Sequence, residues 1–424
     1  MVEQPVRKNE PQGSVVNHGW RVTFAGMGIN LALGILYTWS VISAAIPAEW
    51  GWNEKAKSWP YSIACLVFSL MMVPAGRMQD KIGPRVVASI GGLLVGLGMI
   101  LASTTTSYMG YVLGFGLLAG AGIGFGYASA TPPAVKWFPA ARTGLIAGIV
   151  VSGFGLASVY AAPLTEKLIH EFGVPTTICT LGIGFLAVVV VLAQLLAPPP
   201  KGYLPGGAAA AKAAAAAPRK VDFAAGEVLR TLQFYLLWFT YACGAGAGLM
   251  IIAKLKVIGL EQAGILKTHA FALVAACAVG NGAGRILAGM ISDKLGRLPT
   301  LCGCLLIQAG LMCVLSTVAT DSAIAALAPM MVLAALIGAN YGANLSLFPS
   351  VTKDFYGLKG FGMNYGLVFT AWGVGGFVLS LLAGEIRDRT GSFHTAYYVA
   401  ASLLVLGAIV TFAIKAPRAH RATE

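Results

Sequence analysis

Arg285 is the residue of this chain whose position most clearly suggests chemistry. It lies inside an apolar stretch, at about residues 268–293, that otherwise has the composition of a membrane-spanning helix. A cation near the centre of a bilayer costs at least ~2.5 to 3.5 kcal/mol on insertion scales, so such residues usually face a cavity and bind a ligand. A planar guanidinium pairs best with a carboxylate. The sequence therefore predicts that a small organic acid is bound within a membrane.

The composition indicates a membrane protein with many spans and argues against an enzyme. Hydrophobic residues make up 57% of the chain, charged residues only 11%, and the mean hydropathy is +0.77. An enzyme would need a nucleophile, a base or metal ligands deep in the spans, and the only deep ionisable group is an arginine. The seven cysteines all have apolar neighbours, so we expect no disulfide, no metal and no cofactor. The first 17 residues lack the apolar core of a secretion signal.

Apolar runs long enough to cross ~30 Å of hydrocarbon predict an all-α membrane protein with twelve transmembrane helices in two six-helix bundles. The expected domains are an N-terminal tail (1–19), a first bundle (20–198), a Pro-bounded, Ala-rich linker (199–231), a second bundle (232–416) and a C-terminal tail (417–424). The expected spans are 20–46, 58–78, 85–104, 108–134, 141–162, 172–197, 233–253, 268–292, 298–318, 323–350, 361–384 and 393–415.

The distribution of Lys and Arg predicts the orientation. Of the 29 cations, 20 fall in the tails, the linker and the loops on their side, and eight fall on the other side: Lys55, Lys57, Lys167, Lys254, Lys256, Lys267, Arg387 and Arg389. Both termini and the linker are therefore expected in the cytoplasm, with the protein in the cytoplasmic (inner) membrane. The net charge of +13 then suits anionic lipid rather than nucleic acid. Lys254 and Lys256 are expected to reach the headgroups as interfacial anchors, with attraction of anions as the alternative.

The two halves of the chain repeat a short sequence. GRMQDKIGPR (76–85) matches GMISDKLGR (289–297), and each follows the second span of its half. Duplicated units with the binding site at their interface are typical of secondary transporters.

These residues resemble the major facilitator superfamily, whose loop motif G-x-x-x-D-x-x-G-x-R is filled here by Gly76, Asp80, Gly83 and Arg85. The resemblance implies a cytoplasmic gate. Asp293 occupies the equivalent position of the second half, and Arg297 supplies the basic residue there, one residue earlier than Arg85 does in the first.

A finer resemblance is to the oxalate:formate antiporter family and the related monocarboxylate transporters. It is carried by DFAAGEVLRTLQFYLLW (222–238), NGAGRILAGMISDKLGR (281–297) and NYGLVFTAWG (364–373). It implies that Arg285 binds the substrate carboxylate. It also implies that helices one, four and ten surround the central cavity, which makes these residues candidates for substrate binding: Tyr37, Tyr127, Tyr341, Leu36 and Asn344.

Two departures from the family pattern bear on the substrate. Oxalate-type members carry a lysine in span eleven where this chain has Trp372. Without this lysine, the second carboxylate of oxalate would be buried without a partner, which costs several kcal/mol and disfavours oxalate by roughly a hundredfold. Trp372 and Phe369 would instead offer an apolar wall to a monocarboxylate such as lactate or pyruvate.

The second departure concerns the helix turn before the arginine, where animal monocarboxylate transporters have an acid. Asn281 stands there, on the same helix face as Arg285, and it can orient Arg285 or bind substrate but cannot hold a proton.

Three transport schemes fit the sequence: the anion crosses alone, it exchanges for another anion, or a proton travels with it. The lone arginine favours exchange, because an empty carrier would return with an unpaired buried charge. The resemblance favours proton symport of a small monocarboxylate by alternating access, in a monomer, which we rank first. An organic anion exchanger and a membrane sensor that does not transport are the alternatives.

Overall fold

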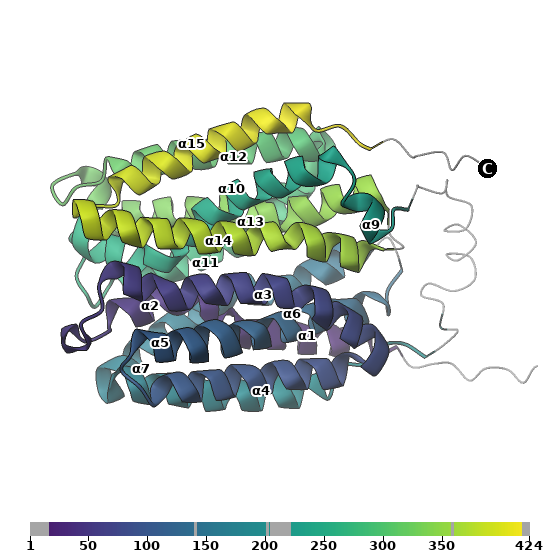
Figure 1. Ribbon diagram of the computed structural model, residues 1–424, viewed down its shortest axis with the longest axis horizontal. Helices are drawn as coiled ribbons and strands as arrows, with labels where there is room; N and C mark the ends of the chain where they lie inside the picture. The colour runs from purple at the N-terminus through teal and green to yellow at the C-terminus, as the bar shows by residue number, and fades with distance from the viewer. Residues whose placement is uncertain (1–16, 140–141, 201–202, 204–221, 358–359, 418–424) are drawn as a thin grey trace, which may run out of the picture.

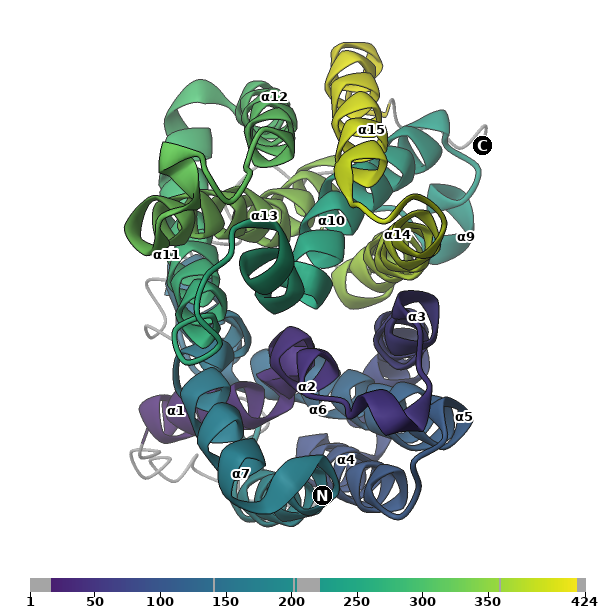
Figure 2. The same cartoon turned by 90° about the vertical axis from the view of Figure 1, so that its left-hand side faces the viewer.

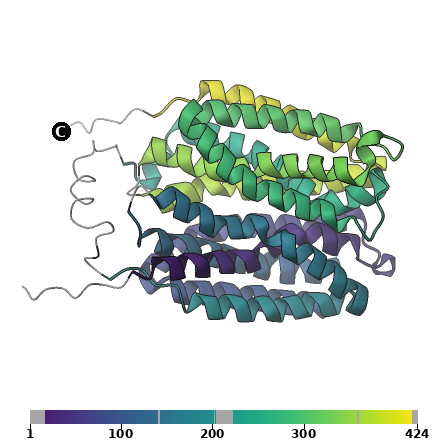
Figure 3. The ribbon, with the colours of Figure 1, turned by 180° about the vertical axis from the view of Figure 1, so that it is seen from behind.

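Long helices form two bundles that lie side by side (Figure 1). The computed structural model describes residues 17–139, 142–200, 203, 222–357 and 360–417, and no strand occurs within these ranges. Most of the two expected tails and the central part of the linker fall outside them. The first helix begins and the last helix ends at the same end of the molecule (Figure 3). We call this the proximal end and the opposite one the distal end.

The first bundle contains the helices that the first half of the chain predicts. Its first crossing is α1 (Gly19–Leu33), continued by the 3-10 turn η1 (Gly34–Thr38) and α2 (Trp39–Ala44). The short η2 (Ala48–Trp50) leads into the long helices, which are α3 (Glu54–Ile82), α4 (Pro84–Ser103), the run of α5 (Tyr108–Tyr111), η3 (Val112–Ala119) and α6 (Gly120–Val135), and α7 (Thr143–Ala193).

The second bundle follows the short α9 (Ala225–Val228). Its elements are α10 (Leu232–Val257) with η5 (Ile258–Gln262), α11 (Phe271–Leu295), α12 (Arg297–Ser316), η6 (Ala323–Ala325), α13 (Leu327–Tyr356), α14 (Phe361–Thr390) and α15 (His394–Ala413).

The number of membrane crossings agrees with the prediction. Among the described residues, 11 helices are long and apolar enough to cross a membrane, and one of them covers Leu145–Ala193 in 49 residues. This helix bends at Gly173, where φ is +75°, a conformation that glycine adopts without penalty. It therefore supplies the fifth and sixth crossings. The helices run further than expected at the distal end, where α3 begins at Glu54 and α14 ends at Thr390, because paired charges occupy the first turn of α3 and the last turns of α14.

The internal repeat is visible in the backbone. Gly83 ends α3 and precedes the 20-residue α4, and Gly296 ends α11 and precedes the 20-residue α12. Their φ, ψ angles are 89°, 158° and 93°, 154°. The repeated sequence thus builds the same sharp turn in each bundle.

Two helix pairs hold the bundles together, α3 with α14 and α7 with α11 (Figure 2). Both pairs are packed most closely in their distal and central parts. A Cβ added at Gly384 would lie 2.5 Å from Ser58 Oγ and one at Gly282 would lie 2.8 Å from Leu156, whereas one at Gly366 would have its nearest neighbour, Val73, at 3.5 Å and one at Gly289 would meet nothing within 4 Å. The contact between the bundles therefore loosens toward the proximal end.

Candidate functional site

Arg285 projects from α11 into the space between the bundles. Glycines on both helices let α11 and α13 approach closely: a Cβ at Gly280 or Gly284 would collide with the carbonyl of Ala335 or Ala339. On the side toward α7, a Cβ at Gly155 would lie 3.2 Å from Arg285 Nη2. The guanidinium therefore lies against the first bundle, and Arg285 is only 6% exposed.

Two hydrogen bonds orient Arg285, and its Nη2 is left without a partner. Its Nε donates to Asn281 Oδ1 over 3.1 Å, and its Nη1 donates to the carbonyl of Val151, on α7, over 2.8 Å. Its Nη2 is buried and has no hydrogen-bond partner. Within the described part of the chain no carboxylate forms an ion pair with Arg285. A buried charged donor without an acceptor is costly, so Nη2 is the position at which an anion would be stabilised most.

The predicted tyrosines lie around this guanidinium. The hydroxyls of Tyr37, Tyr127 and Tyr341 all interact with it electrostatically, and that of Tyr127 also lies within hydrogen-bonding range of the guanidinium. Tyr37 Oη and Tyr341 Oη are 2.5 Å apart, which joins η1 of the first bundle to α13 of the second. Trp372 Nε1 donates to Tyr341 Oη over 2.7 Å. The predicted residues Arg285, Asn281 and these aromatics thus form one constellation at the interface between the bundles.

Aromatic rings close the site toward the first bundle. Phe369 stacks on Trp372 with ring centroids 5.2 Å apart and lies 6.2 Å from the ring of Tyr127. Phe68 and Phe154 complete the group, since each packs against Tyr127. Sequence reasoning missed these two phenylalanines, because an isolated Phe in an apolar span has no feature that separates it from ordinary core. The group forms an apolar wall suited to a short carbon skeleton.

A small cavity adjoins the constellation on its distal side. Its volume is about 10 Å³, and it is lined by Tyr37, Ser158, Ile252, Leu255, Val274, Cys277, Ala278 and Asn281; this is roughly the space that one water molecule needs. Of the predicted substrate-binding residues, only Tyr37 and Asn281 line it. Its lining combines the polar side chains of Tyr37, Ser158 and Asn281 with apolar side chains.

Leu36 and Asn344 are the two remaining candidates for substrate binding. Leu36 is fully buried in η1. Asn344 Nδ2 donates to the carbonyl of Asn340 over 3.2 Å, and a Cβ at Gly244 would lie 2.8 Å from its Oδ1. Asn344 therefore faces α10 within the second bundle, and its role in binding stays a prediction.

The residues of the repeated motif lie at the proximal end and make contacts within their own bundles. Arg85 Nε donates to the carbonyl of Leu196 over 2.8 Å. Arg297 pairs with Asp293 over 2.6 Å and lies 3.5 Å from Asp354. Gly76 belongs to α3 and has no atom within 4 Å of an added Cβ. The backbone of Asp80 belongs to α3 as well, and its side chain lies outside the described residues. The gating role of this set stays a prediction.

The prediction that Lys254 and Lys256 anchor the protein at the headgroups is wrong. Their side chains are 3% and 1% exposed. Lys254 Nζ pairs with Glu54 of α3 over 2.8 Å, and Lys256 pairs with Glu166 of α7. Both lysines point inward because carboxylates of the other bundle neutralise them there. These partners are 200 and 90 residues away in the chain, so the local sequence gave no sign of the pairing.

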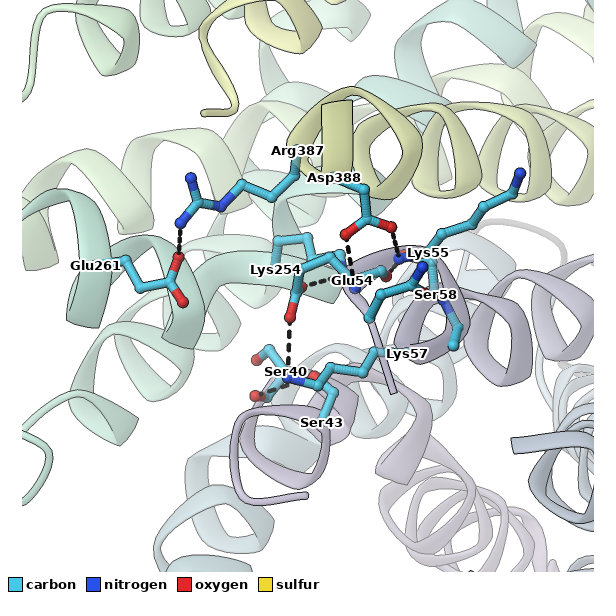
Figure 4. Close-up of polar contacts among 12 residues, drawn as sticks. Ser40, Ser43, Glu54, Lys55, Lys57, Ser58, Lys254, Glu261, Arg387 and Asp388 are labelled. Atoms are coloured by element: carbon cyan, nitrogen blue, oxygen red, sulfur yellow. Dashed lines mark hydrogen bonds and ion pairs between the residues drawn. The ribbon is translucent and has the colours of Figure 1, made fainter. Parts of the chain in front are cut away.

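The distal charges form a larger set around the start of α3 (Figure 4). The carboxylate of Asp388, on α14, accepts hydrogen bonds from the backbone amides of Glu54 and Lys55, both over 2.9 Å. Glu54 also accepts from Lys57 over 2.9 Å, and Lys55 pairs with Glu385 over 2.5 Å. At the end of η5, Glu261 pairs with Arg387. The distal ends of the two bundles are thus joined by charged side chains.

Comparison with known proteins decides the family. The model of the Major Facilitator Superfamily matches residues 24–328 and 258–424, which together cover nearly the whole chain. The chain belongs to the major facilitator superfamily. This agrees with the two bundles, the repeated turn and the motif at 76–85, and it makes the protein a multi-pass membrane transporter.

Several curated members of this superfamily are similar along most of their length. The oxalate:formate antiporter of Oxalobacter formigenes is 26% identical over 97% of this chain and 96% of its own. Monocarboxylate transporter 11 of Mus musculus is 27% identical over 95% of this chain and 88% of its own. An uncharacterised transporter of the superfamily from Escherichia coli is 27% identical over 84% and 85%. The resemblances that the sequence suggested are therefore confirmed at the level of the family.

Proposed function

We propose that this major facilitator protein carries small monocarboxylates of the lactate or pyruvate type across the cytoplasmic membrane, by alternating access and together with a proton. The observation that carries the proposal is the unpartnered Nη2 of Arg285, buried at the interface of the bundles. A substrate carboxylate there completes the hydrogen bonding of the guanidinium and neutralises it. The names of two relatives, a monocarboxylate transporter and an oxalate:formate antiporter, support a small carboxylate as cargo.

The number of charges at the site favours a monoanion. Arg285 is the one cation in the constellation, and Trp372 occupies the position of the second cation of oxalate-type carriers, with its indole bonded to Tyr341. A second carboxylate would meet aromatic rings and would lose its hydration without a partner. The site thus favours a short acid with one carboxylate.

The coupling scheme can be tested by uptake of labelled L-lactate into proteoliposomes. Symport predicts accumulation in empty vesicles when an inward proton gradient is imposed, and no accumulation after a protonophore collapses the gradient. An exchanger, the second candidate, would take up label only when the vesicles contain unlabelled lactate, whatever the proton gradient. No lactate uptake under either condition would refute a carboxylate carrier.

The proposed orientation, with the proximal end in the cytoplasm, predicts that a tag after residue 424 is cleaved by protease only from the cytoplasmic side.

A further inference from the structure

The buried distal lysines are not used by the site around Arg285. Lys254 and Lys256 are two residues apart on α10, so they point to different sides of the helix. One reaches α3 and the other reaches α7, and in both cases the partner carboxylate belongs to the first bundle. The distal end of α10 is therefore held between two helices of the opposite bundle by two ion pairs.

The two pairs stand directly beside the cavity. Leu255, the residue between the lysines, lines it together with Ile252, one turn earlier on α10. The cavity in turn reaches Asn281, which is bonded to Arg285. The section of α10 that carries the lysines therefore lies between the distal ion pairs and the cavity next to Asn281.

Separation of the bundles at the distal end would break both pairs and leave their charges on opposite walls. Glu54 and Glu166 would remain on the first bundle, and the two ammonium groups would remain on α10. A lysine that has lost its carboxylate is stabilised by any other carboxylate that reaches it. An incoming monocarboxylate carries the same chemical group as the side chains that have just left.

We propose that Lys254 and Lys256 form an entry site for carboxylate anions, which is masked by Glu54 and Glu166 when the distal end is closed and exposed when it opens. The same lysines serve as the latch of the closed state. When the bundles close again, Glu54 and Glu166 displace the anion from the lysines, and the anion moves on to the free nitrogen of Arg285. This inference rests on the proposed function, with the distal end facing outward.

The charged groups around the two lysines predict that they contribute unequally to the capture of the anion. Besides Glu54, Lys254 faces Lys57 of α3 and Asp388 of α14. Asp388 belongs to the same bundle as Lys254 and would stay beside it as a negative neighbour. Lys256 pairs with Glu166 and is also affected by the cationic Lys267. Removal of Lys256 should therefore weaken anion capture more than removal of Lys254.

The latch can be tested with Cys277, which lines the cavity and is only 4% exposed. In right-side-out vesicles, a variant that keeps Cys277 and has the other six cysteines replaced by alanine should react slowly with a membrane-impermeant thiol reagent. Two double variants break the latch. One lacks the carboxylates (Glu54→Gln with Glu166→Gln), the other lacks the lysines (Lys254→Gln with Lys256→Gln), and each should react faster with the reagent. Lys167→Gln is the control, because Lys167 is 72% exposed and its partner Glu171 is on the same helix. Labelling of both double variants at the rate of the parent would overturn the latch.

The entry site is tested by comparing the two double variants, because one keeps only the lysines and the other keeps only the carboxylates. Loss of the carboxylates leaves the lysines free, so the KM for L-lactate uptake should fall or stay unchanged. Loss of the lysines should raise this KM by about 10-fold at low ionic strength, the scale of electrostatic concentration of a charged ligand, and the rise should shrink as salt is added. Equal KM values in the two double variants would overturn the entry site.

A variant with the two charges exchanged shows whether faster labelling comes from the broken ion pair or from misfolding. Glu54→Lys combined with Lys254→Glu keeps the ion pair but moves the cation to the first bundle, so Cys277 should be protected as in the parent. Labelling as fast as in the broken pairs would overturn the role of this pair in the latch. Failure of the proposed function gives a different result, namely no lactate uptake by the parent, and the labelling rates still test the latch in that case.

Discussion

At the scale of single residues, the site depends on how the donors of Arg285 are used. A guanidinium has five N–H groups in a planar fork. Nε and Nη1 are bonded to Asn281 and Val151, and these bonds fix the plane of the fork. Nη2 is left for a ligand. Two nitrogens of the guanidinium thus orient the third. An acidic residue at position 281 would neutralise the guanidinium, whereas Asn281 leaves its charge in place.

Replacement of Arg285 by lysine should abolish most transport. An ammonium keeps the charge but cannot hold Asn281, Val151 and a carboxylate in one plane. Loss of one charge-assisted hydrogen bond, about 1.5 to 3 kcal/mol, corresponds to roughly a 10- to 100-fold rise in the KM for L-lactate. Arg389→Lys is the matched control, because Arg389 is 76% exposed and pairs with Glu385 at the surface. Unchanged uptake by Arg285→Ala would remove the binding role.

Replacement of Trp372 by lysine should let oxalate compete. The new ammonium would stand beside Tyr341, where the indole now donates, and could pair with a second carboxylate. We expect the concentration of oxalate that halves lactate uptake to fall by at least about 10-fold, which corresponds to ~1.4 kcal/mol. Trp372→Phe removes the indole N–H without adding charge and should show no such gain. Equal oxalate inhibition in both variants would mean that substrate charge is selected elsewhere.

At the scale of helices, glycines determine where Arg285 can stand. Two on α11 face backbone carbonyls of α13, and two on α13, Gly338 and Gly342, face carbonyls of α11. The backbones therefore touch along several turns, and this contact sets the position of α11 relative to α7. Side chains in the contact would push α11 away from α13.

Gly284→Ala should destabilise the second bundle and impair transport. The added methyl would overlap the carbonyl of Ala339, and overpacking of this kind costs ~1–3 kcal/mol. We expect a lower Tm in detergent and a reduced uptake of lactate, because Arg285 is the next residue. Gly289→Ala, on the same helix, adds a methyl where no atom lies within 4 Å and should leave the Tm unchanged. A Tm for Gly284→Ala equal to that of Gly289→Ala would show that the α11–α13 contact tolerates a methyl.

Local features of the sequence predicted much of the architecture and the centre of the site. Apolar runs predicted the twelve crossings, the charged repeat predicted that the two halves are duplicated units, and the i, i+4 spacing predicted that Asn281 lies beside Arg285. The matching turns at Gly83 and Gly296 were seen only in the structure. What could not be predicted depends on contacts between distant segments. The carbonyl of Val151 has no sequence signature, since every residue carries one. The burial of Lys254 and Lys256 followed only from partners in the other bundle.

At the scale of the whole molecule, the bundles are joined across the distal half and are looser at the proximal end. The hydrogen bond from Arg285 to Val151 and the one between Tyr37 and Tyr341 also cross the interface. Movement of the bundles that opens the distal end would separate these partners. Without substrate, the guanidinium would then lose an acceptor while Nη2 is still unpaired.

This predicts that the return of the empty carrier limits the rate of transport. A carrier that returns loaded keeps a carboxylate on Arg285 throughout, whereas an empty one crosses the barrier with a poorly compensated charge. Unlabelled lactate inside proteoliposomes, at equal pH on both sides, should therefore accelerate entry of labelled lactate severalfold. Acetate inside, which has a carboxylate but no 2-hydroxyl, tests whether the carboxylate alone suffices, and a neutral amide such as lactamide should give no acceleration. Equal initial rates with and without internal lactate would show that the empty carrier returns freely, and the unpaired nitrogen of Arg285 would then not control the cycle.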